Sequence, residues 1–255
     1  MGLGKEKNQI KINFILKFLL LFTHLFFSNN IYANQKPDLT SIWDIKIGMS
    51  FEDVPAKDFM FFACGTDGGP PGKPLKNKFA DYNECKPDKY GLKEVYFEYD
   101  DEALYWAMAN YEKRLVRFQG TKVMAYSSIL SLLFDDNGIV KGIRIMTDPR
   151  ASLFERKKAV LLKKHLEGMW GKDPWDCKDI PRLEGETSVS EKQKFIKDIC
   201  MKFQKDKYVI LQSRYFRKKG QTGFTPSGNP TLSYFESWTK VEVFSNDIKL
   251  EKYEH

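Results

Sequence analysis

The middle of the chain contains a pattern that specifies two neighbouring strands. Apolar runs at 127–134 and 139–146 flank Asp135-Asp136-Asn137-Gly138. An Asn-Gly pair between two such runs is typical of a tight β-hairpin, because both residues tolerate a left-handed backbone. The acidic turn also resembles part of a calcium loop, but Leu133 stands at the first ligand position. We therefore expect a hairpin, and an antiparallel sheet around it.

Other segments share the alternation or the β-branched and aromatic content of strands. They lie at 41–47, 94–99, 121–126, 208–217 and 231–244. A polar loop rich in Gly, Ser and Thr, 218–230, separates the last two. The sheet is therefore expected to draw strands from both halves of the chain.

Two helices are expected, both in the second half. Asp148 is a candidate N-cap with Pro149 at the first helical position, and an apolar face follows as far as Gly168. A shorter helix is predicted at 190–203, where a capping box at Ser190 precedes apolar residues at helical spacing. The predicted fold class is α+β: a mainly antiparallel sheet with hairpins, packed against one long and one short helix.

The first 33 residues have the layout of a secretory signal peptide. Lysines precede an apolar run at 14–27, and Ala33 suits the position before a cleavage site. The run is shorter than the ~20 residues that span a bilayer. We expect a mature chain in the periplasm or outside the cell of a bacterium, without a transmembrane helix; an uncleaved anchor is the alternative.

The chain has four cysteines, all after the predicted leader. An even number in an oxidising compartment indicates two disulfides, and four cysteines allow three pairings. We favour the local pairs Cys64–Cys85 and Cys177–Cys200, which close loops of similar length. A zinc site would need closely spaced ligands, which these cysteines lack. No metal and no cofactor are predicted.

The charge of the chain does not indicate a nucleic-acid partner. The net charge is +7, and removal of the leader lowers it to +4 because four lysines and one glutamate are lost. The remaining basic and acidic residues are nearly balanced, as on an ordinary solvated surface. A basic helix face at 150–164 is expected to be solvated, with contact to an anionic surface as the alternative.

Acidic and aromatic side chains gather between residues 94 and 111. Glu98, Asp100 and Asp101 are candidate catalytic carboxylates, since paired acids beside aromatic rings suit glycoside hydrolysis. The candidate binding residues beside them are Tyr99, Tyr105 and Trp106. The same pattern is typical of a strand edge followed by an acidic helix start. His165 stands among lysines and is expected to be a helix residue rather than a catalytic base.

Residues Ile45-Lys46-Ile47-Gly48-Met49-Ser50-Phe51-Glu52-Asp53-Val54 resemble the Ile-x-x-Gly-Met-Ser/Thr-x-x-x-Val opening of envelope domains of the BamE (SmpA/OmlA) type. The resemblance implies a small exported α/β module. Some members of that family are accessory parts in outer-membrane assembly. It implies no catalytic residue in this chain.

The predicted organisation is a leader at 1–33, a β-rich part at 34–146 and an α+β part at 147–255, the last two possibly forming one continuous domain. The two cysteine pairs occupy similar places in the two parts, which indicates either a duplication or chance. We expect a non-enzymatic binding or envelope-assembly accessory module, with an envelope protein or polysaccharide as partner. The alternative is a hydrolase of envelope polysaccharide that uses the carboxylates at 98–102.

Overall fold

The protein is described here by a computed structural model. It describes residues 42–99, 121–171, 174–189 and 194–250, apart from 222, 225, 228–229 and 232–234. The predicted leader and the candidate residues Asp100, Asp101, Tyr105 and Trp106 lie outside the described residues.

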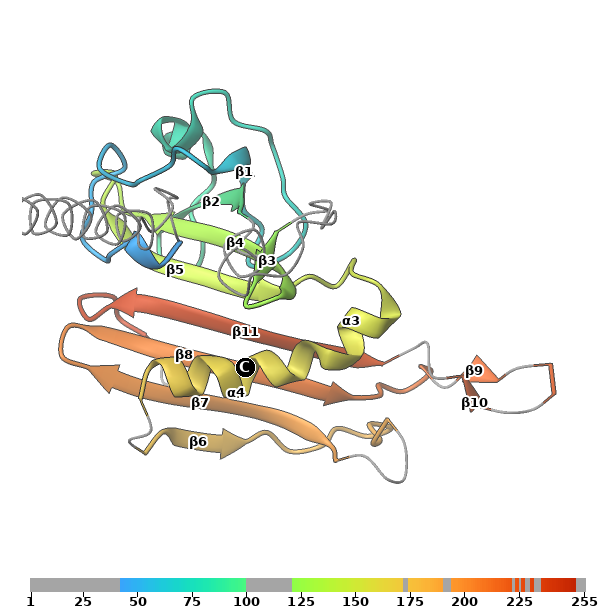
Figure 1. The fold of residues 1–255 in the computed structure, drawn as a ribbon. Coiled ribbons are helices and arrows are strands. Elements are labelled where there is room, and N and C mark those ends of the chain that lie inside the picture. Colours follow the sequence, from blue (N-terminus) through green and yellow to red (C-terminus); the bar gives the residue numbers. More distant parts are fainter. Residues whose placement is uncertain are drawn as a thin grey trace, which may run out of the picture. The chain divides into compact units, whose positions relative to one another are not determined.

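The described residues form an antiparallel sheet of nine strands, with a broken helix across one face (Figure 1). The strands of this sheet are β1 (Met60–Cys64), β2 (Lys93–Glu98), β3 (Lys122–Val123), β4 (Tyr126–Phe134), β5 (Val140–Thr147), β6 (Asp176–Asp179), β7 (Ile196–Gln204), β8 (Lys207–Phe216) and β11 (Glu236–Ser245). A separate small ribbon pairs β9 (Gly223–Phe224) with β10 (Pro230–Thr231). The predicted fold class is therefore confirmed.

The helical elements are two short 3-10 helices near the start and one helix in three parts. They are η1 (Ile42–Asp44), η2 (Lys78–Glu84), α3 (Leu153–Lys158), η3 (Ala159–Leu161) and α4 (Leu162–Met169). No helix in this part of the chain is long and apolar enough to cross a membrane.

The order of strands divides the sheet into two similar parts. Across the sheet the order is β1-β2-β4-β5-β11-β8-β7-β6, with β3 paired to β4. Each part is a meander of four main strands in chain order, and the two meanders meet through their last strands, β5 and β11. Strand β11 thus lies inside the sheet, although it comes near the end of the chain.

The main hydrophobic core lies on the sheet face that carries the helix. Leu162 and Leu166 of α4 are fully buried, in one cluster with Leu211 of β8 and Val241 of β11. Burial of each such side chain stabilises the fold by about 1.5–3 kcal/mol. The apolar stripe of the helix therefore packs on the apolar side chains that the strands turn toward this face.

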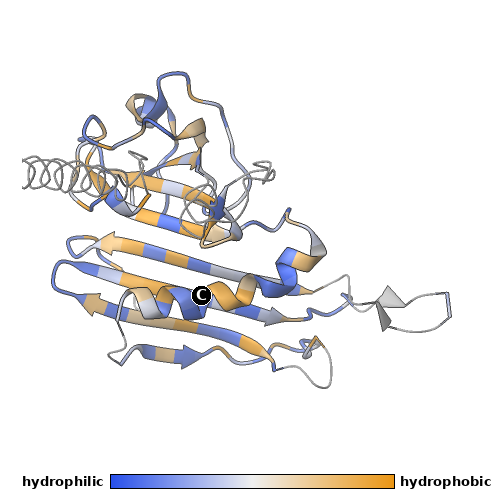
Figure 2. Cartoon of the chain, in the orientation of Figure 1, coloured by the Kyte–Doolittle hydropathy of each residue, from blue (hydrophilic) through white to orange (hydrophobic). Residues whose placement is uncertain are grey.

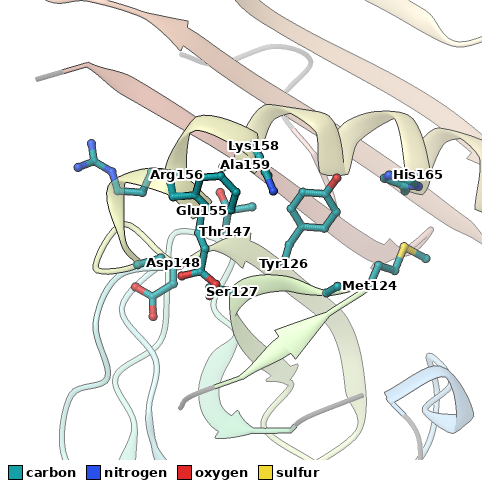
Figure 3. Close-up of a pocket in the computed structure, with 13 residues that line it drawn as sticks. Met124, Tyr126, Ser127, Thr147, Asp148, Glu155, Arg156, Lys158, Ala159 and His165 are labelled. Carbon is teal, nitrogen blue, oxygen red and sulfur yellow. Dashed lines mark hydrogen bonds between the residues drawn. The ribbon is translucent and has the colours of Figure 1, made fainter. Parts of the chain in front are cut away.

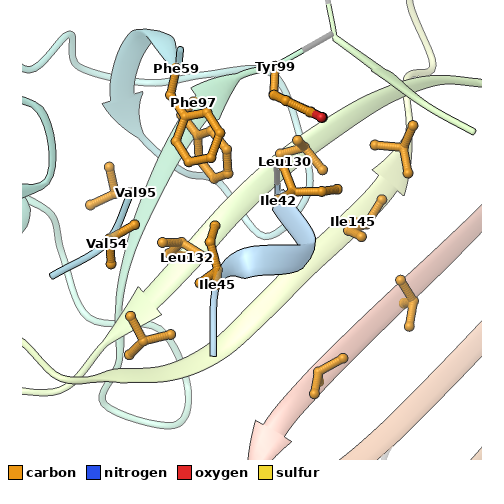
Figure 4. Close-up of a cluster of buried hydrophobic side chains, with 14 of the residues drawn as sticks. Ile42, Ile45, Val54, Phe59, Val95, Phe97, Tyr99, Leu130, Leu132 and Ile145 are labelled. Carbon is orange, nitrogen blue, oxygen red and sulfur yellow. The ribbon is translucent and has the colours of Figure 1, made fainter. Parts of the chain in front are cut away.

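The same core continues over the first meander (Figure 4). Phe59 lies against Phe97 of β2, with ring centroids 4.6 Å apart. Ile42 and Ile45 enter this core from η1 and the segment after it. The prediction of a strand at 41–47 is wrong, because these residues fill the core as a 3-10 turn rather than joining the sheet.

Two details of the predicted long helix differ in the structure. The helix begins after Ser152, whose Oγ accepts from the amide of Glu155, whereas Asp148 accepts from the amide of Arg150 in the preceding turn. The helix also tightens at η3, where Thr239 Oγ1 of β11 donates to the carbonyl of Ala159 over 3.0 Å. The carbonyl of Ala159 thus binds a side-chain donor at the point where the helix is interrupted between α3 and α4.

The predicted short helix at 190–203 is wrong: residues 196–204 form β7. Ile199 and Phe203 suggested a helical stripe, but Cys200 faces the helix side while Ile199 belongs to the apolar cluster of the other face. A strand that buries side chains on both faces loses strict alternation and imitates helical spacing.

The central hairpin and both disulfides are confirmed. The turn between β4 and β5 is longer than a two-residue turn: Asp135 Oδ1 accepts from the amides of Asn137 and Ile139, and only Gly138 has a positive φ there. Cys64–Cys85 joins β1 to the residue after η2, and Cys177–Cys200 joins β6 to β7 at directly paired positions.

Candidate functional site

The predicted acidic and aromatic cluster is only partly described, and its described members do not form a cleft. Glu98, at the end of β2, accepts a hydrogen bond from Tyr96 Oη over 2.8 Å. Burial and the Glu98 carboxylate raise the pKa of Tyr96 above its ordinary value. Tyr99 is a core residue whose ring meets that of Phe59 edge-on. The contacts of Glu98 and Tyr99 among the described residues are thus to Tyr96 and to the core.

A first hollow of about 320 Å³ lies between the start of β4 and the helix (Figure 3). Ser127 Oγ accepts from Lys122 Nζ over 2.9 Å and donates to Glu155 Oε1 over 3.0 Å. Lys122 also forms an ion pair with Glu155. Lys122, Ser127 and Glu155 therefore form one hydrogen-bonded group at this hollow.

The contacts in this first hollow fasten a strained hairpin to the helix. Met124 and Ala125 form the turn between β3 and β4 with φ values of 51° and 66°, which non-glycine residues rarely adopt. Tyr126 follows the turn, and its ring lies 5.7 Å from the ring of the exposed His165 on α4 (Figure 3). Desolvation would raise the pKa of Glu155, but hydrogen bonds from Lys122 and Ser127 lower it below the ordinary value.

A larger groove, of about 740 Å³, lies on the sheet face opposite the helix. Val209 and Leu211 of β8 point to the helix-side core, whereas Ile210, Gln212 and Arg214 line the groove. We call this hollow the second-face groove. Its floor spans three adjacent strands, β11, β8 and β7.

Paired residues form three rows across the floor of the second-face groove. The first row is Trp238, Arg214 and Lys197; the second is Lys240, Gln212 and Ile199; the third is Glu242, Ile210 and Met201. The rows therefore change from aromatic and cationic at one end to largely apolar at the other. Figure 2 shows the same mixture of hydrophilic and hydrophobic residues along these strands.

The walls of the groove come from loops. Asp67 and Tyr90 lie on one side, and Ile180 and Leu183 on the other. Gly68, with φ +80°, rests on the sheet so closely that a Cβ would lie 2.9 Å from Met146 Sδ. Only glycine fits both this backbone and this contact. The loop around Asp67 and Gly68, which lies between the two cysteines of the first disulfide, therefore forms part of one wall of the groove. We call it the rim loop.

Arg214 is a cation on the floor of the groove without a carboxylate ion pair among the described residues. Its Nη1 donates to the carbonyls of Asp198 and Ser213, and its guanidinium lies 5.0 Å from the ring of Trp238. No ion pair joins Arg214 to a carboxylate of the described residues. Desolvation lowers the pKa of Arg214, against the charges of Asp198 and Glu186. A guanidinium with unused donors is suited to a carboxylate or phosphate.

The neighbouring lysines are already paired. Lys197 Nζ lies 2.8 Å from Glu186 Oε2, and Lys240 Nζ lies 2.8 Å from Asp67 Oδ1 and 3.3 Å from Glu242 Oε1. Their charges are therefore largely neutralised within the protein. Lys89 also lines the groove without a carboxylate ion pair among the described residues, but it is exposed and lies over the ring of Tyr90. An anionic ligand on the floor of the groove would therefore meet Arg214.

Beneath the groove, Arg144 holds the polar side chains of β5 and β11 in place. Its Nε donates to Glu242 Oε1 over 2.8 Å, its Nη1 lies 2.7 Å from Glu94 Oε2, and its Nη2 lies 3.1 Å from Asp67 Oδ1. The charges of Glu242, Glu94 and Asp67 raise the pKa of this guanidinium despite its burial, which opposes them. Arg144 therefore links the sheet to the rim loop.

Comparison of the chain with models of protein families, with curated proteins and with solved structures gave no match. Within the described ranges, no three His, Cys, Asp or Glu side chains converge as a metal site. The groove was not predicted from the sequence, because its residues come from segments between 67 and 242 that meet only in the folded sheet.

Proposed function

We propose that this chain is an exported, non-enzymatic binding module whose second-face groove binds a small anionic ligand with an apolar part. The observation that carries the proposal is Arg214: a half-buried cation beside Trp238, without a carboxylate partner among the described residues, at the end of an apolar floor. Burial of an uncompensated charge is costly, so a site that retains one favours an anion there.

The size and composition of the groove support a small-molecule ligand. Ligand sites commonly have volumes of about 300–1,000 Å³, with a mainly apolar lining and a few polar groups that orient the ligand. The second-face groove, at about 740 Å³, has that character, with Ile199, Ile210 and Met201 opposite the polar row. The two carboxylates that line the groove, Asp67 and Glu242, are both held in ion pairs with Lys240 and Arg144, which favours binding over hydrolysis.

The proposed location rests on the leader and on the disulfides. The first 33 residues have the layout of a signal peptide, and two disulfides suit an oxidising compartment. We propose the periplasm or the cell exterior. The BamE-type pattern at 45–54 supports a role in the bacterial envelope.

The test uses anilinonaphthalene sulfonate, an anionic aromatic probe, in fluorescence titrations of the secreted full-length protein. Arg214→Gln is expected to weaken binding at least about tenfold, since a hydrogen bond to a charged group contributes about 1.5–3 kcal/mol. Arg182→Gln is the matched control, because Arg182 is also stacked on a ring, that of Phe195, but does not line the groove. Equal affinity of wild type and Arg214→Gln would refute the proposal.

A further inference from the structure

The apolar floor of the second-face groove continues beyond the groove along β7. Ile199, Met201 and Phe203 alternate on this strand and point to the same face. Met201 lines both the groove and a second hollow of about 570 Å³, which Phe203 and Tyr208 also line. At about 3.3 Å per residue, the strand from Lys197 to Phe203 offers about 20 Å of floor.

This apolar path is accessible. Phe203 is 57% exposed and Leu183, at the wall of the groove, is 67% exposed. Leu183 lines the groove and Phe203 lines the second hollow, so these exposed apolar side chains lie at two places along the path. The path is also narrow: on the side toward β11, Tyr90 packs against Phe244, with ring centroids 5.1 Å apart. The path therefore follows β7 and β8.

The polar end of the path has room for one anionic group. Arg214 lies in the first row of the floor, whereas Met201 and Phe203 lie toward the far end of β7. Lys197 and Lys240 already have carboxylate partners. Arg214 is thus the described cation of the strand floor without a carboxylate ion pair, and a cation at one end of a linear apolar path is complementary to a linear molecule with one charged head.

We infer that the ligand of the second-face groove is a single-chain anionic amphiphile, with a carboxylate-type head group at Arg214 and an alkyl chain along Ile199, Met201 and Phe203. This inference rests on the proposed function and names the chemical class of the ligand. The head group contributes charge-assisted hydrogen bonds and the chain contributes apolar burial.

The test measures the affinities of octanoate, dodecanoate and hexadecanoate by displacement of anilinonaphthalene sulfonate below their micellar concentrations. A fully buried methylene contributes about fourfold in affinity. Because this path is open to solvent on one side, we expect at least about a tenfold rise from octanoate to dodecanoate.

Phe203→Ser tests the far end of the path. It is expected to weaken hexadecanoate binding at least about fivefold and to leave octanoate binding unchanged, since only the longest chain matches the length of the path as far as residue 203. Phe61→Ser is the matched control. Phe61 is similarly exposed, at 67%, but it lies on β1, at the opposite edge of the sheet from β7.

The outcomes separate the two proposals. If no carboxylate binds and Arg214→Gln does not alter probe binding, the proposed function itself fails. If the carboxylates bind through Arg214 but chain length and Phe203→Ser have no effect, the proposed function stands and the single-chain inference is refuted. A chain-length dependence that Phe61→Ser abolishes and Phe203→Ser preserves would also refute it.

Discussion

Arg144 on β5 and Glu242 on β11 are directly paired across the only strand junction that joins the two meanders in the described sheet, and Arg144 Nε donates to Glu242 Oε1 over 2.8 Å. Both side chains are buried, with 2% and 8% of their surfaces exposed. A buried ion pair contributes little against an apolar replacement, but removal of one partner leaves an uncompensated charge. The pair thus makes the junction sensitive to single substitutions.

Arg144→Met is expected to lower the free energy of unfolding by about 3–5 kcal/mol, because Glu94 would lose its buried cation and Glu242 would retain Lys240 but lose its closer partner. Urea unfolding followed by circular dichroism measures the change. The double variant Arg144→Met with Glu242→Leu is expected to regain part of the loss. If the double variant were less stable than Arg144→Met, the ion pair would not be the cause.

Removal of the second disulfide is expected to destabilise the chain and to release β6. All four residues of β6 are exposed, so burial contributes little to holding this edge strand. Cys177→Ala with Cys200→Ala should cost about 3 kcal/mol in the chain-entropy account of a loop of this length. Hydrogen exchange of the β6 amides should accelerate.

The matched control is Cys64→Ala with Cys85→Ala, which opens a loop of similar length. It should lower stability by a similar amount and leave exchange in β6 unchanged relative to the rest of the sheet. Faster exchange in β6 in both variants would mean that the second disulfide has no local role.

Asp67→Asn is expected to make the free energy of unfolding less dependent on pH. Desolvation would raise the pKa of Asp67, but Lys240 and Arg144 outweigh it and hold the pKa below its ordinary value. A lowered folded-state pKa contributes stability above the unfolded-state pKa of about 3.9, and this contribution is lost as the pH falls through the folded-state value. The contribution is small, under about 1 kcal/mol, because the side chain is 72% exposed.

The measurement compares urea unfolding of wild type and Asp67→Asn between neutral and strongly acid pH. Wild type should be the more stable at neutral pH, and the two curves should converge in acid. A stability difference that stays constant over the whole range would show that the asparagine acts through the loop backbone and not through the lost charge.

Gly142→Ala is expected to destabilise the sheet by about 1–3 kcal/mol, the usual cost of overpacking a core. A Cβ at this position of β5 would lie 2.6 Å from Leu133 Cδ1 and 3.1 Å from Phe244 Cδ1. Thermal unfolding measures the effect. Gly168→Ala is the control: it lies in α4 with no atom within 4 Å of the new Cβ, so it should be neutral or stabilise by up to about 1 kcal/mol.

Local sequence patterns predicted the structure correctly where residues close together in the sequence determine it. The hairpin around Asn137 and Gly138 was predicted because both of its strands and its turn are contiguous in the sequence. The disulfides followed from cysteine spacing and compartment. The same local reading failed for β7, because burial on both faces of the strand produced an apolar pattern close to that of a helix.

The groove depends on contacts that local patterns do not contain. Arg144 and Glu242 are 98 residues apart, and Asp67 and Lys240 are 173 apart. Neither Trp238 nor Arg214 carries a motif, and their proximity follows from the pairing of β8 with β11. The place of β11 between β5 and β8 would have had to be known before these residues could be assigned to one site.

The central place of β11 also has a consequence for how the chain reaches its native state. Until residues 236–245 are available, β5 and β8 each have an unpaired edge, and neither meander has its closing partner. Exposed strand edges are sites of aggregation. A protein that lacks residues 236–245 therefore cannot complete the sheet, and a chaperone that shields these edges would act at the step on which folding yield depends.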